Sequence, residues 1–298
     1  MILVTGGTGF IGQSLIQHLV QMGKPVRTLL RPSQKSPKLP IGVPVEVAVT
    51  SLRDERGLRA ALKDVEVIVH LAGGERHGSR SDLELTDVEG ARILADAAKD
   101  ASIRRIIYLS HLGADRASAY TVMKAKAIAE GFLQRSGVET KIIRTAVVYG
   151  PKDQFTTSLV RLLKLSPFVF LMPGDGHNLL QPIWLEDLIA CIQMVIDDPS
   201  RESQVIAIGG GEYLTFREVL EMVMDASRVR RRIIPTSPVA LRYFSLLVEQ
   251  VIPWFPISIF WLDYLSADRT CALDILPRQF GLIPARFSQQ LQYLRPVS

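Results

Sequence analysis

The sequence predicts an α/β fold, a doubly wound parallel sheet followed by a smaller, mostly helical C-terminal domain. Short apolar runs alternate with segments of helical periodicity through residues 1–151, an order that is typical of parallel strands joined by helices. Hydrophobic residues make up 47% of the 298-residue chain and charged residues 22%, proportions that exclude a disordered or fibrous protein.

The alternation begins at the first residue of the chain. An apolar run at 1–4 precedes a glycine-rich turn, and apolar residues then recur at helical spacing from Ile11 to Met22. Further strands are expected at 26–30, 43–49, 66–74, 105–114 and 140–151, and further helices at 58–65, 88–101 and 121–135. Helices of this kind cover both faces of a parallel sheet, and ligands bind at the carboxyl ends of its strands.

Two domains are expected from this organisation. Residues 1–153, continued by 180–210, form the nucleotide-binding domain, and residues 154–179 and 211–298 form the smaller substrate or docking domain. The stretch 203–227 predicts a strand, a glycine turn and an amphipathic helix, with Thr215 as the N-cap and Glu218 completing a capping box.

The turn "GGTGFIG" at 6–12 carries the first functional prediction. It satisfies the G-x-G-x-x-G spacing between a strand and a helix, where glycines let the backbone approach a pyrophosphate and the helix N-terminus favours its charge. This context predicts a dinucleotide-binding Rossmann fold rather than a tight turn without a ligand. The residues expected to hold the dinucleotide here are Gly6, Gly7, Thr8, Gly9, Phe10, Ile11 and Gly12.

The end of the second expected strand predicts which dinucleotide binds. A chain that selects NAD usually places an acid there for the ribose hydroxyls, but this stretch reads "LLRPSQKSPK" and offers Arg31, Ser33 and Lys35. A guanidinium and a hydroxyl can bind the 2′-phosphate that a carboxylate would repel, so the predicted cofactor is NADP(H). The alternative is that Arg31 stacks on adenine or faces water.

Together these segments resemble the extended and atypical short-chain dehydrogenase/reductases. The resembling pieces are "VTGGTGFIG", "VIVHLAG", "YLSHLGA", "KAIAE", "IIRTAVVYGP" and "QPIWLEDL", in the order of that family. "SHLGAD" and "KAIAE" are closest to the atypical branch, which holds NmrA-like nucleotide sensors and the Rossmann-fold accessory subunit of respiratory complex I. The resemblance implies that Ser110 is the active-site serine and that the cofactor is lined by Leu71, Ala72, Gly73, Ser110, Lys126, Thr145 and Val148.

The catalytic tyrosine and lysine depart from the family pattern. The family lysine is commonly followed four residues later by a glutamate, a spacing that Lys126 and Glu130 have, so Lys126 is the expected catalytic lysine and Val122 stands at the tyrosine position. Tyr120 is the other catalytic candidate, because it precedes Lys124 by four residues. Helical periodicity places both of these on the solvated face, unless the helix begins late and Tyr120 belongs to the preceding loop. Near the start of the 88–101 helix, where the family often has an asparagine, this chain has Asp87.

These departures leave three functions open. The first is an NADP(H)-dependent oxidoreductase acting on a fairly apolar substrate, which can work without the tyrosine if Lys126 holds the ribose and polarises a substrate oxygen. A non-catalytic NADPH-binding subunit or sensor, docked on a membrane complex, would keep the same residues. A sugar-nucleotide epimerase or dehydratase is the third hypothesis, weakened by the missing tyrosine.

Charge and composition constrain the partners and the compartment. A net charge of +5 with a pI near 9.3 suits phosphate ligands or an anionic membrane surface and is no nucleic-acid signature. Two lone cysteines and a chain that opens directly on a strand indicate the cytoplasm, and no cluster of metal ligands is expected.

Residues 235–265 are the unusual region of the C-terminal half. They are apolar and aromatic, and Arg242, Glu249 and Pro253 interrupt them too often for a membrane span. One interpretation is a pair of helices over the substrate, with Tyr243, Phe244, Trp254 and Phe255 as packing residues. The other is an interfacial surface that rests on a membrane or on a partner protein.

Overall fold

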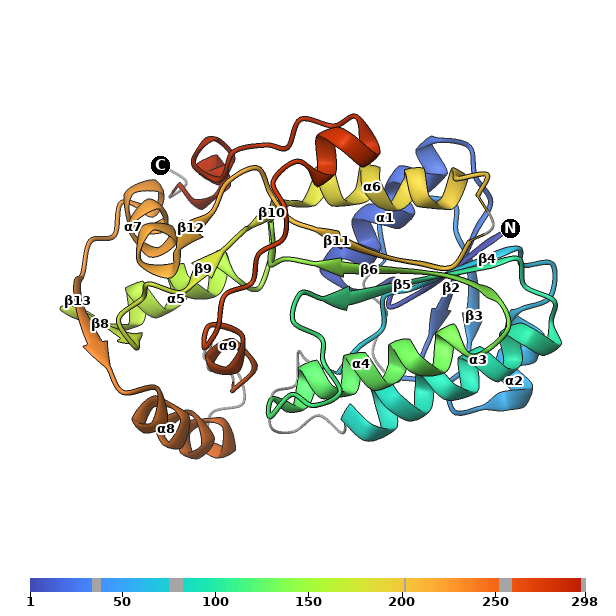
Figure 1. Ribbon diagram of the computed structural model, residues 1–298, viewed down its shortest axis with the longest axis horizontal. Helices are drawn as coiled ribbons and strands as arrows, with labels where there is room; N and C mark the ends of the chain where they lie inside the picture. Colours follow the sequence, from blue (N-terminus) through green and yellow to red (C-terminus); the bar gives the residue numbers. More distant parts are fainter. Residues whose placement is uncertain (34–38, 75–82, 201, 252–258, 296–298) are drawn as a thin grey trace. The chain divides into compact units, whose positions relative to one another are not determined.

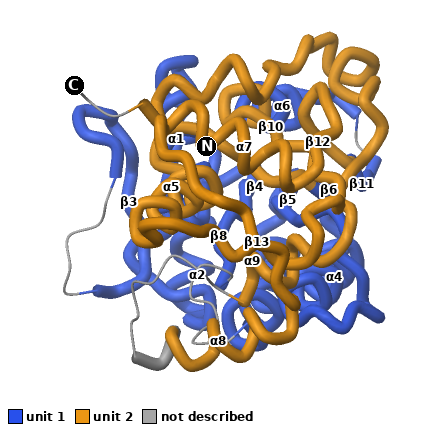
Figure 2. The backbone as a smooth tube through the Cα atoms, turned by 90° about the vertical axis from the view of Figure 1, so that its left-hand side faces the viewer, with its two compact units in different colours: residues 1–74, 82–144, 189–206 blue, residues 75–81, 145–188, 207–298 orange. Residues whose placement is uncertain are grey.

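The computed structural model describes residues 1–33, 39–74, 83–200, 202–251 and 259–295 (Figure 1). Lys35, Pro253, Trp254 and Phe255 lie outside the described residues. The chain divides into two compact units (Figure 2). Unit 1 comprises residues 1–74, 82–144 and 189–206, and unit 2 comprises residues 75–81, 145–188 and 207–298.

A seven-stranded sheet is the framework of unit 1. Its strands are ordered β11-β6-β5-β4-β1-β2-β3, and β3, β2, β1, β4 and β5 pair in parallel. The bounds are β1 (Ile2–Thr5), β2 (Val26–Leu30), β3 (Glu46–Val49), β4 (Val67–His70), β5 (Arg105–His111), β6 (Glu139–Thr145) and β11 (Gln204–Ile208). The order reverses between β1 and β4, which is the switch point where a doubly wound sheet binds its ligand.

Helices cover both faces of this sheet, as the alternation predicts (Figure 1). One face carries α1 (Phe10–Gln21) and α6 (Leu185–Asp197), which are joined by a 2.7 Å hydrogen bond between the side chains of His18 and Gln193. The other face carries α2 (Glu55–Ala61), α3 (Gly90–Asp100) and α4 (Thr121–Gln134), and a π-helix, η2 (Glu84–Glu89), leads into α3. The doubly wound prediction is therefore confirmed.

Several predicted boundaries are wrong by a few residues, for local reasons. The helix expected at 58–65 begins at Glu55, because the Asp54 carboxylate caps it by accepting a 3.0 Å hydrogen bond from the Gly57 amide. The strands expected to reach 74 and 114 end at His70 and His111, before the small residues that turn the chain away from the sheet. The strand expected at 140–151 is β6 followed by a separate two-residue strand, β7 (Val148–Tyr149).

In its described residues, unit 2 consists mainly of helices, with three two-stranded sheets. The helices are α5 (Thr156–Leu165), α7 (Phe216–Ser227), α8 (Pro238–Val251), α9 (Ile259–Tyr264), η3 (Leu276–Phe280), η4 (Phe287–Gln289) and η5 (Leu291–Leu294). The sheets pair β7 with β10 (Ile183–Trp184), β8 (Val169–Pro173) with β13 (Arg232–Thr236), and β9 (Leu179–Leu180) with β12 (Leu214–Thr215). The predicted capping box is confirmed, because Thr215 and Glu218 exchange both cap hydrogen bonds at the start of α7.

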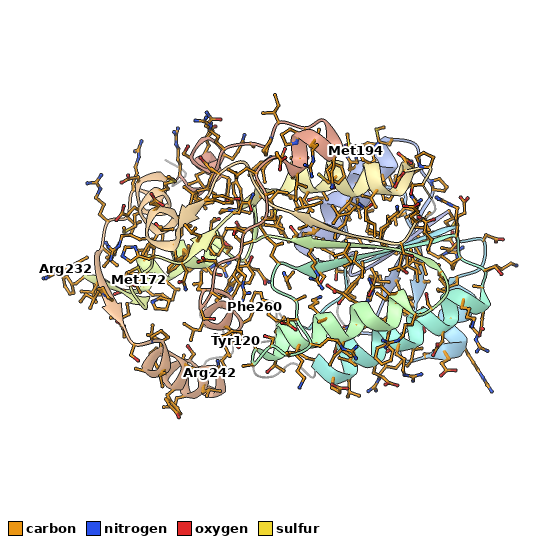
Figure 3. All side chains as sticks on the ribbon, in the orientation of Figure 1. Tyr120, Met172, Met194, Arg232, Arg242 and Phe260 are labelled. Atoms are coloured by element: carbon orange, nitrogen blue, oxygen red, sulfur yellow. The ribbon has the colours of Figure 1, made fainter. Side chains whose placement is uncertain are left out.

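The apolar stretch 235–265 forms α8 and α9 in its described parts. Arg242 of α8 is ion-paired with Asp263 of α9, and Figure 3 shows Arg242 on α8 and Phe260 on α9. Tyr243 is 68% exposed, so the interpretation of this side chain as a packing residue is wrong, whereas Phe244 is 47% exposed and its packing role stays a prediction. Among the residues searched, which are those the structure describes, no helix has the length and apolarity to cross a membrane.

Candidate functional site

The glycine turn of unit 1 packs too closely for side chains. Gly6 has φ +71°, in the left-handed region, and a Cβ there would lie 2.8 Å from the Ala72 amide nitrogen. A Cβ on Gly12 would lie 2.3 Å from the Gly6 carbonyl oxygen. Gly9 is the N-cap of α1 and has no side chain to occupy the first amides, and the first turn has no acid. This turn therefore leaves a helix N-terminus open to an anion, which fits a pyrophosphate.

The neighbouring strand end is braced against the same turn. The Thr5 hydroxyl lies 2.7 Å from His70 Nδ1 and accepts a 3.3 Å hydrogen bond from the Ala72 amide. This holds the half-buried segment Leu71 to Gly73 beside Gly6. The sequence predicted this segment but not the roles of Thr5 and His70. Each of these is a polar residue at the end of an apolar strand, and that position could have pointed to them.

The described residues that directly follow β2 carry a positive charge and no negative one. Arg31 and Ser33 are exposed immediately after Leu30, and no carboxylate among the described residues pairs with Arg31. An exposed guanidinium at this strand end fits a ribose 2′-phosphate.

The side chains of Lys126 and Lys124 lie in different environments. Lys124 is exposed, whereas Lys126 is 2% exposed and its Nζ lies 3.2 Å from Asp87 Oδ1. Asp87 Oδ2 accepts a 2.7 Å hydrogen bond from the Gly74 amide. The residue at the family's asparagine position is therefore the ion-pair partner of Lys126, a role that the sequence alone did not reveal.

A line of buried contacts joins this ion pair to the glycine turn. Lys126 Nζ lies 5.3 Å from the centre of the Tyr108 ring, which stacks on His70 at a centroid distance of 5.3 Å. His70 in turn contacts Thr5, at the end of β1. The sequence did not predict this role for Tyr108, because an aromatic residue within an apolar strand is an ordinary packing residue.

The remaining candidates are placed as follows. Tyr120 precedes α4, whose first residue is Thr121, so it belongs to the loop, as the alternative for this residue allowed. Val122, one turn before Lys126, is buried. Ser110 is also fully buried near the end of β5, and its hydroxyl has no hydrogen-bond partner among the described residues.

Two predicted cofactor contacts belong to unit 2. The buried Thr145 hydroxyl donates a 3.0 Å hydrogen bond to the Ala146 carbonyl, and Val148 is half-buried. Their roles toward a cofactor remain predictions. No group of three potential metal ligands occurs in the part of the chain that the structure describes.

Known proteins resemble this chain over most of its length. Residues 6–164 match the family described as NAD(P)H-binding. The chain is 29% identical to the mitochondrial NADH dehydrogenase (ubiquinone) 1 alpha subcomplex subunit 9 of Arabidopsis thaliana, over 95% of this chain and 76% of that protein. It is 27% identical to sterol demethylase protein B of Methylococcus capsulatus, over 83% of this chain and 80% of that protein.

A third relative and one solved structure complete the comparison. The chain is 31% identical to ceramide reductase of Caulobacter vibrioides, over 56% of this chain and 52% of that protein. The structure of MoeE5 in complex with UDP-glucuronic acid and NAD has a TM-score of 0.75 and 18% identity, covering 99% of this chain and 97% of that one. At that identity the likeness shows the fold alone.

Proposed function

The chain belongs to the NAD(P)H-binding family, as an atypical short-chain dehydrogenase/reductase, and on this premise we propose that it is an NADPH-dependent oxidoreductase acting on a fairly apolar substrate. The observation that carries the proposal is the buried Lys126–Asp87 ion pair, which the Tyr108 and His70 contacts connect to the glycine turn. A buried ion pair is costly to desolvate, so its connection to the glycine turn through Tyr108 and His70 favours a catalytic role.

The cofactor assignment rests on the chemistry of the strand ends. Gly6, Gly12 and the open N-terminus of α1 would hold the pyrophosphate, and Arg31 would pair with the 2′-phosphate. When bound there, NADPH would supply the hydride for reduction of a substrate carbonyl. Ceramide reductase and sterol demethylase protein B carry lipids in their names, which supports an apolar substrate for this chain as well.

Three residues would handle the substrate oxygen and its proton. The Ser110 hydroxyl would donate a hydrogen bond to the substrate oxygen, on which negative charge develops as the hydride arrives. Lys126 would stabilise that charge and deliver the proton, with Asp87 fixing the position of its ammonium group. Val122 supplies no acid at the family's tyrosine position, so the lysine takes over this part of the reaction.

Turnover by charge-neutral variants tests this proposal. Purified protein with NADPH is challenged with quinones, enones and aldehydes, and consumption of NADPH is followed by its absorbance. The double variant Lys126→Met with Asp87→Asn removes both charges of the pair, so no unpaired charge is left buried. We therefore expect a folded protein that binds NADPH and whose turnover falls by about a hundredfold or more. The matched control is Lys124→Met, at an exposed position on the same helix, which should keep full activity. Full turnover in the double variant would contradict the catalytic role.

A second function is favoured by a specific surface. Four residues of α8 expose apolar side chains: Val239, Tyr243, Phe244 and Leu247 are 63%, 68%, 47% and 66% exposed. Exposed apolar helix faces mark interaction sites, and the Arabidopsis relative is named as a subunit of NADH dehydrogenase. The alternative is therefore a non-catalytic NADPH-binding subunit that docks through α8.

Vesicle binding tests the docking alternative. We expect the wild-type protein to sediment with vesicles that contain phosphatidylglycerol, and Val239→Ser with Leu247→Ser to remain in the supernatant, because the variant loses apolar area that would enter the lipid interface. Ile283→Ser, at a 91% exposed position outside α8, is the control and should sediment like the wild type. Equal sedimentation of the α8 variant would rule out docking on lipid through this helix.

A further inference from the structure

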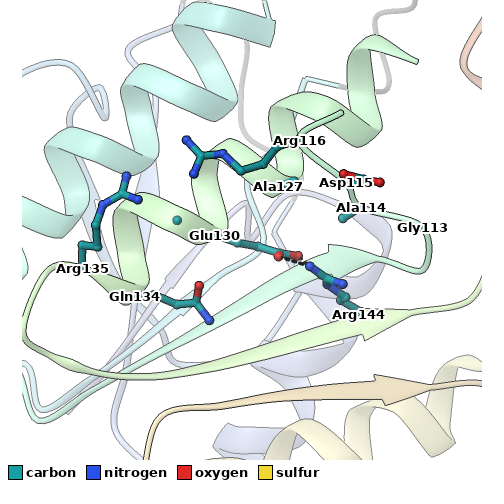
Figure 4. Close-up of a pocket in the computed structure, with 10 residues that line it drawn as sticks. Gly113, Ala114, Asp115, Arg116, Ala127, Glu130, Gln134, Arg135 and Arg144 are labelled. Atoms are coloured by element: carbon teal, nitrogen blue, oxygen red, sulfur yellow. Dashed lines mark hydrogen bonds and ion pairs between the residues drawn. The ribbon is translucent and has the colours of Figure 1, made fainter. Parts of the chain in front are cut away.

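A pocket of about 600 Å³ opens on unit 1, away from the glycine turn. It is formed by the connection from β5 to α4, by one side of α4 and by Arg144 of β6 (Figure 4). No residue of the turn at 6–12, or of the strand ends at 31–33 and 71–74, lines it. The pocket is therefore distinct from the proposed dinucleotide site.

The α4 side of the pocket combines two small residues with two polar ones. Ala127 and Gly131 lie one helical turn apart on α4, and Glu130 and Gln134 line the pocket beside them. The nearest atom that a Cβ on Gly131 would meet is Arg135 Nη1, at 3.4 Å. The guanidinium of Arg135 therefore lies over the helix at Gly131, and its position is supported by the Phe132 ring, 5.5 Å from Arg135 Cζ.

Three arginines line this pocket, and they differ in how their charge is balanced. Arg144 makes two hydrogen bonds to the carboxylate of the buried Glu130, drawn as a dashed line in Figure 4. The pKa of Arg144 is raised, first by the hydrogen bond to Glu130 and further by the charges of Glu130 and Asp115. Arg116 and Arg135 have no ion-pair partner among the described residues. Figure 4 shows the side chains of Arg116 and Arg135 among the residues that line the pocket.

We propose that this pocket binds a phosphomonoester through Arg116 and Arg135. Two unpaired guanidinium groups from different segments offer donor forks for one tetrahedral anion, and a phosphomonoester carries nearly two negative charges at neutral pH, which balances both. A cavity of about 600 Å³ is far larger than a phosphate group, so the organic part of the ester lies over Ala127 and Gly131. Glu130 is held by Arg144 and so does not compete for the other two arginines.

Calorimetry with glycerol 3-phosphate, on protein saturated with NADPH, tests the proposal. We expect binding to the wild type and a loss of about tenfold in affinity for each of Arg116→Gln and Arg135→Gln, because each removes a charge-assisted hydrogen-bonding partner. Arg161→Gln, at an exposed arginine of α5, is the matched control and should bind like the wild type. Gly131→Leu keeps both guanidinium groups and fills the pocket, so it should also lose binding.

Other outcomes decide against the site or identify the source of the ester. Unchanged affinity in Arg116→Gln and Arg135→Gln, or inorganic phosphate binding as tightly as the ester, would overturn the proposal. Sedimentation with vesicles containing phosphatidic acid, compared with phosphatidylcholine alone, distinguishes a lipid ester from a soluble one, and either result requires the same two arginines. NADPH affinity should be equal in all variants, because none of them touches the dinucleotide site.

Discussion

Replacing Gly12 by alanine is expected to abolish dinucleotide binding. The added methyl group would lie 2.3 Å from the Gly6 carbonyl oxygen and 2.8 Å from the Gly7 α-carbon, both of them backbone atoms that cannot rotate away. The turn must open to admit it, and Gly6 would lose its position beside Ala72. Since the pyrophosphate is to be bound by that backbone, calorimetric titration with NADPH should show a loss of at least about a hundredfold in affinity.

The control for this substitution is another helical glycine. Gly131 lies on α4, and its added Cβ would meet first the flexible end of Arg135, at 3.4 Å. Gly131→Ala should keep full NADPH affinity and raise the free energy of unfolding by up to about 1 kcal/mol, because alanine favours the helix. A Gly12→Ala protein that binds NADPH normally would mean that the turn does not hold the dinucleotide in this manner.

Replacing Arg105 by alanine should lower the free energy of unfolding severely. Its fully buried guanidinium is ion-paired with Glu139 and donates hydrogen bonds to the carbonyls of Val195, Ile196 and Ser200. The carbonyls of Val195 and Ile196 belong to the end of α6, where no further turn of helix is available to satisfy them. The substitution leaves a carboxylate and three carbonyls with fewer partners, which typically costs about 3 to 5 kcal/mol.

Urea unfolding followed by circular dichroism measures this loss. Arg59→Ala is the matched control, because its ion pair with Asp100 has both side chains more than half exposed and should contribute less than about 1 kcal/mol. A midpoint for Arg105→Ala within the range of the Arg59→Ala control would show that Arg105 does not tie the end of α6 to the sheet.

The strands, the glycine turn and the lysine could be predicted because local signals agree there. The alternation of apolar segments predicted strands β1 to β5 of the large sheet. The apolar stripe on α4 distinguished the buried Lys126 from the exposed Lys124. Strand ends were less predictable, because apolar sequence continues past His70 and His111 after the ladder hydrogen bonds stop.

Contacts between distant segments could not be predicted in the same way. Asp87 and Lys126 are 39 positions apart, and only the packing of η2 beside α4 brings their charges together. The pocket beside Arg116 and Arg135 combines a loop, a helix and a strand, so no window of sequence contains it. The exposure of Tyr243 is likewise a property of what surrounds α8, which its own periodicity does not report.

Comparing NADPH with NADH in a calorimeter tests the central claim most directly, which is that a guanidinium at the end of β2 selects the phosphorylated cofactor. The wild type should bind NADPH about tenfold to a hundredfold more tightly than NADH, the range expected for a charge-assisted hydrogen-bonded contact. Arg31→Asp should weaken NADPH binding far more than NADH binding, because the carboxylate repels the 2′-phosphate. Equal affinities in the wild type, or equal losses in the variant, would contradict the claim.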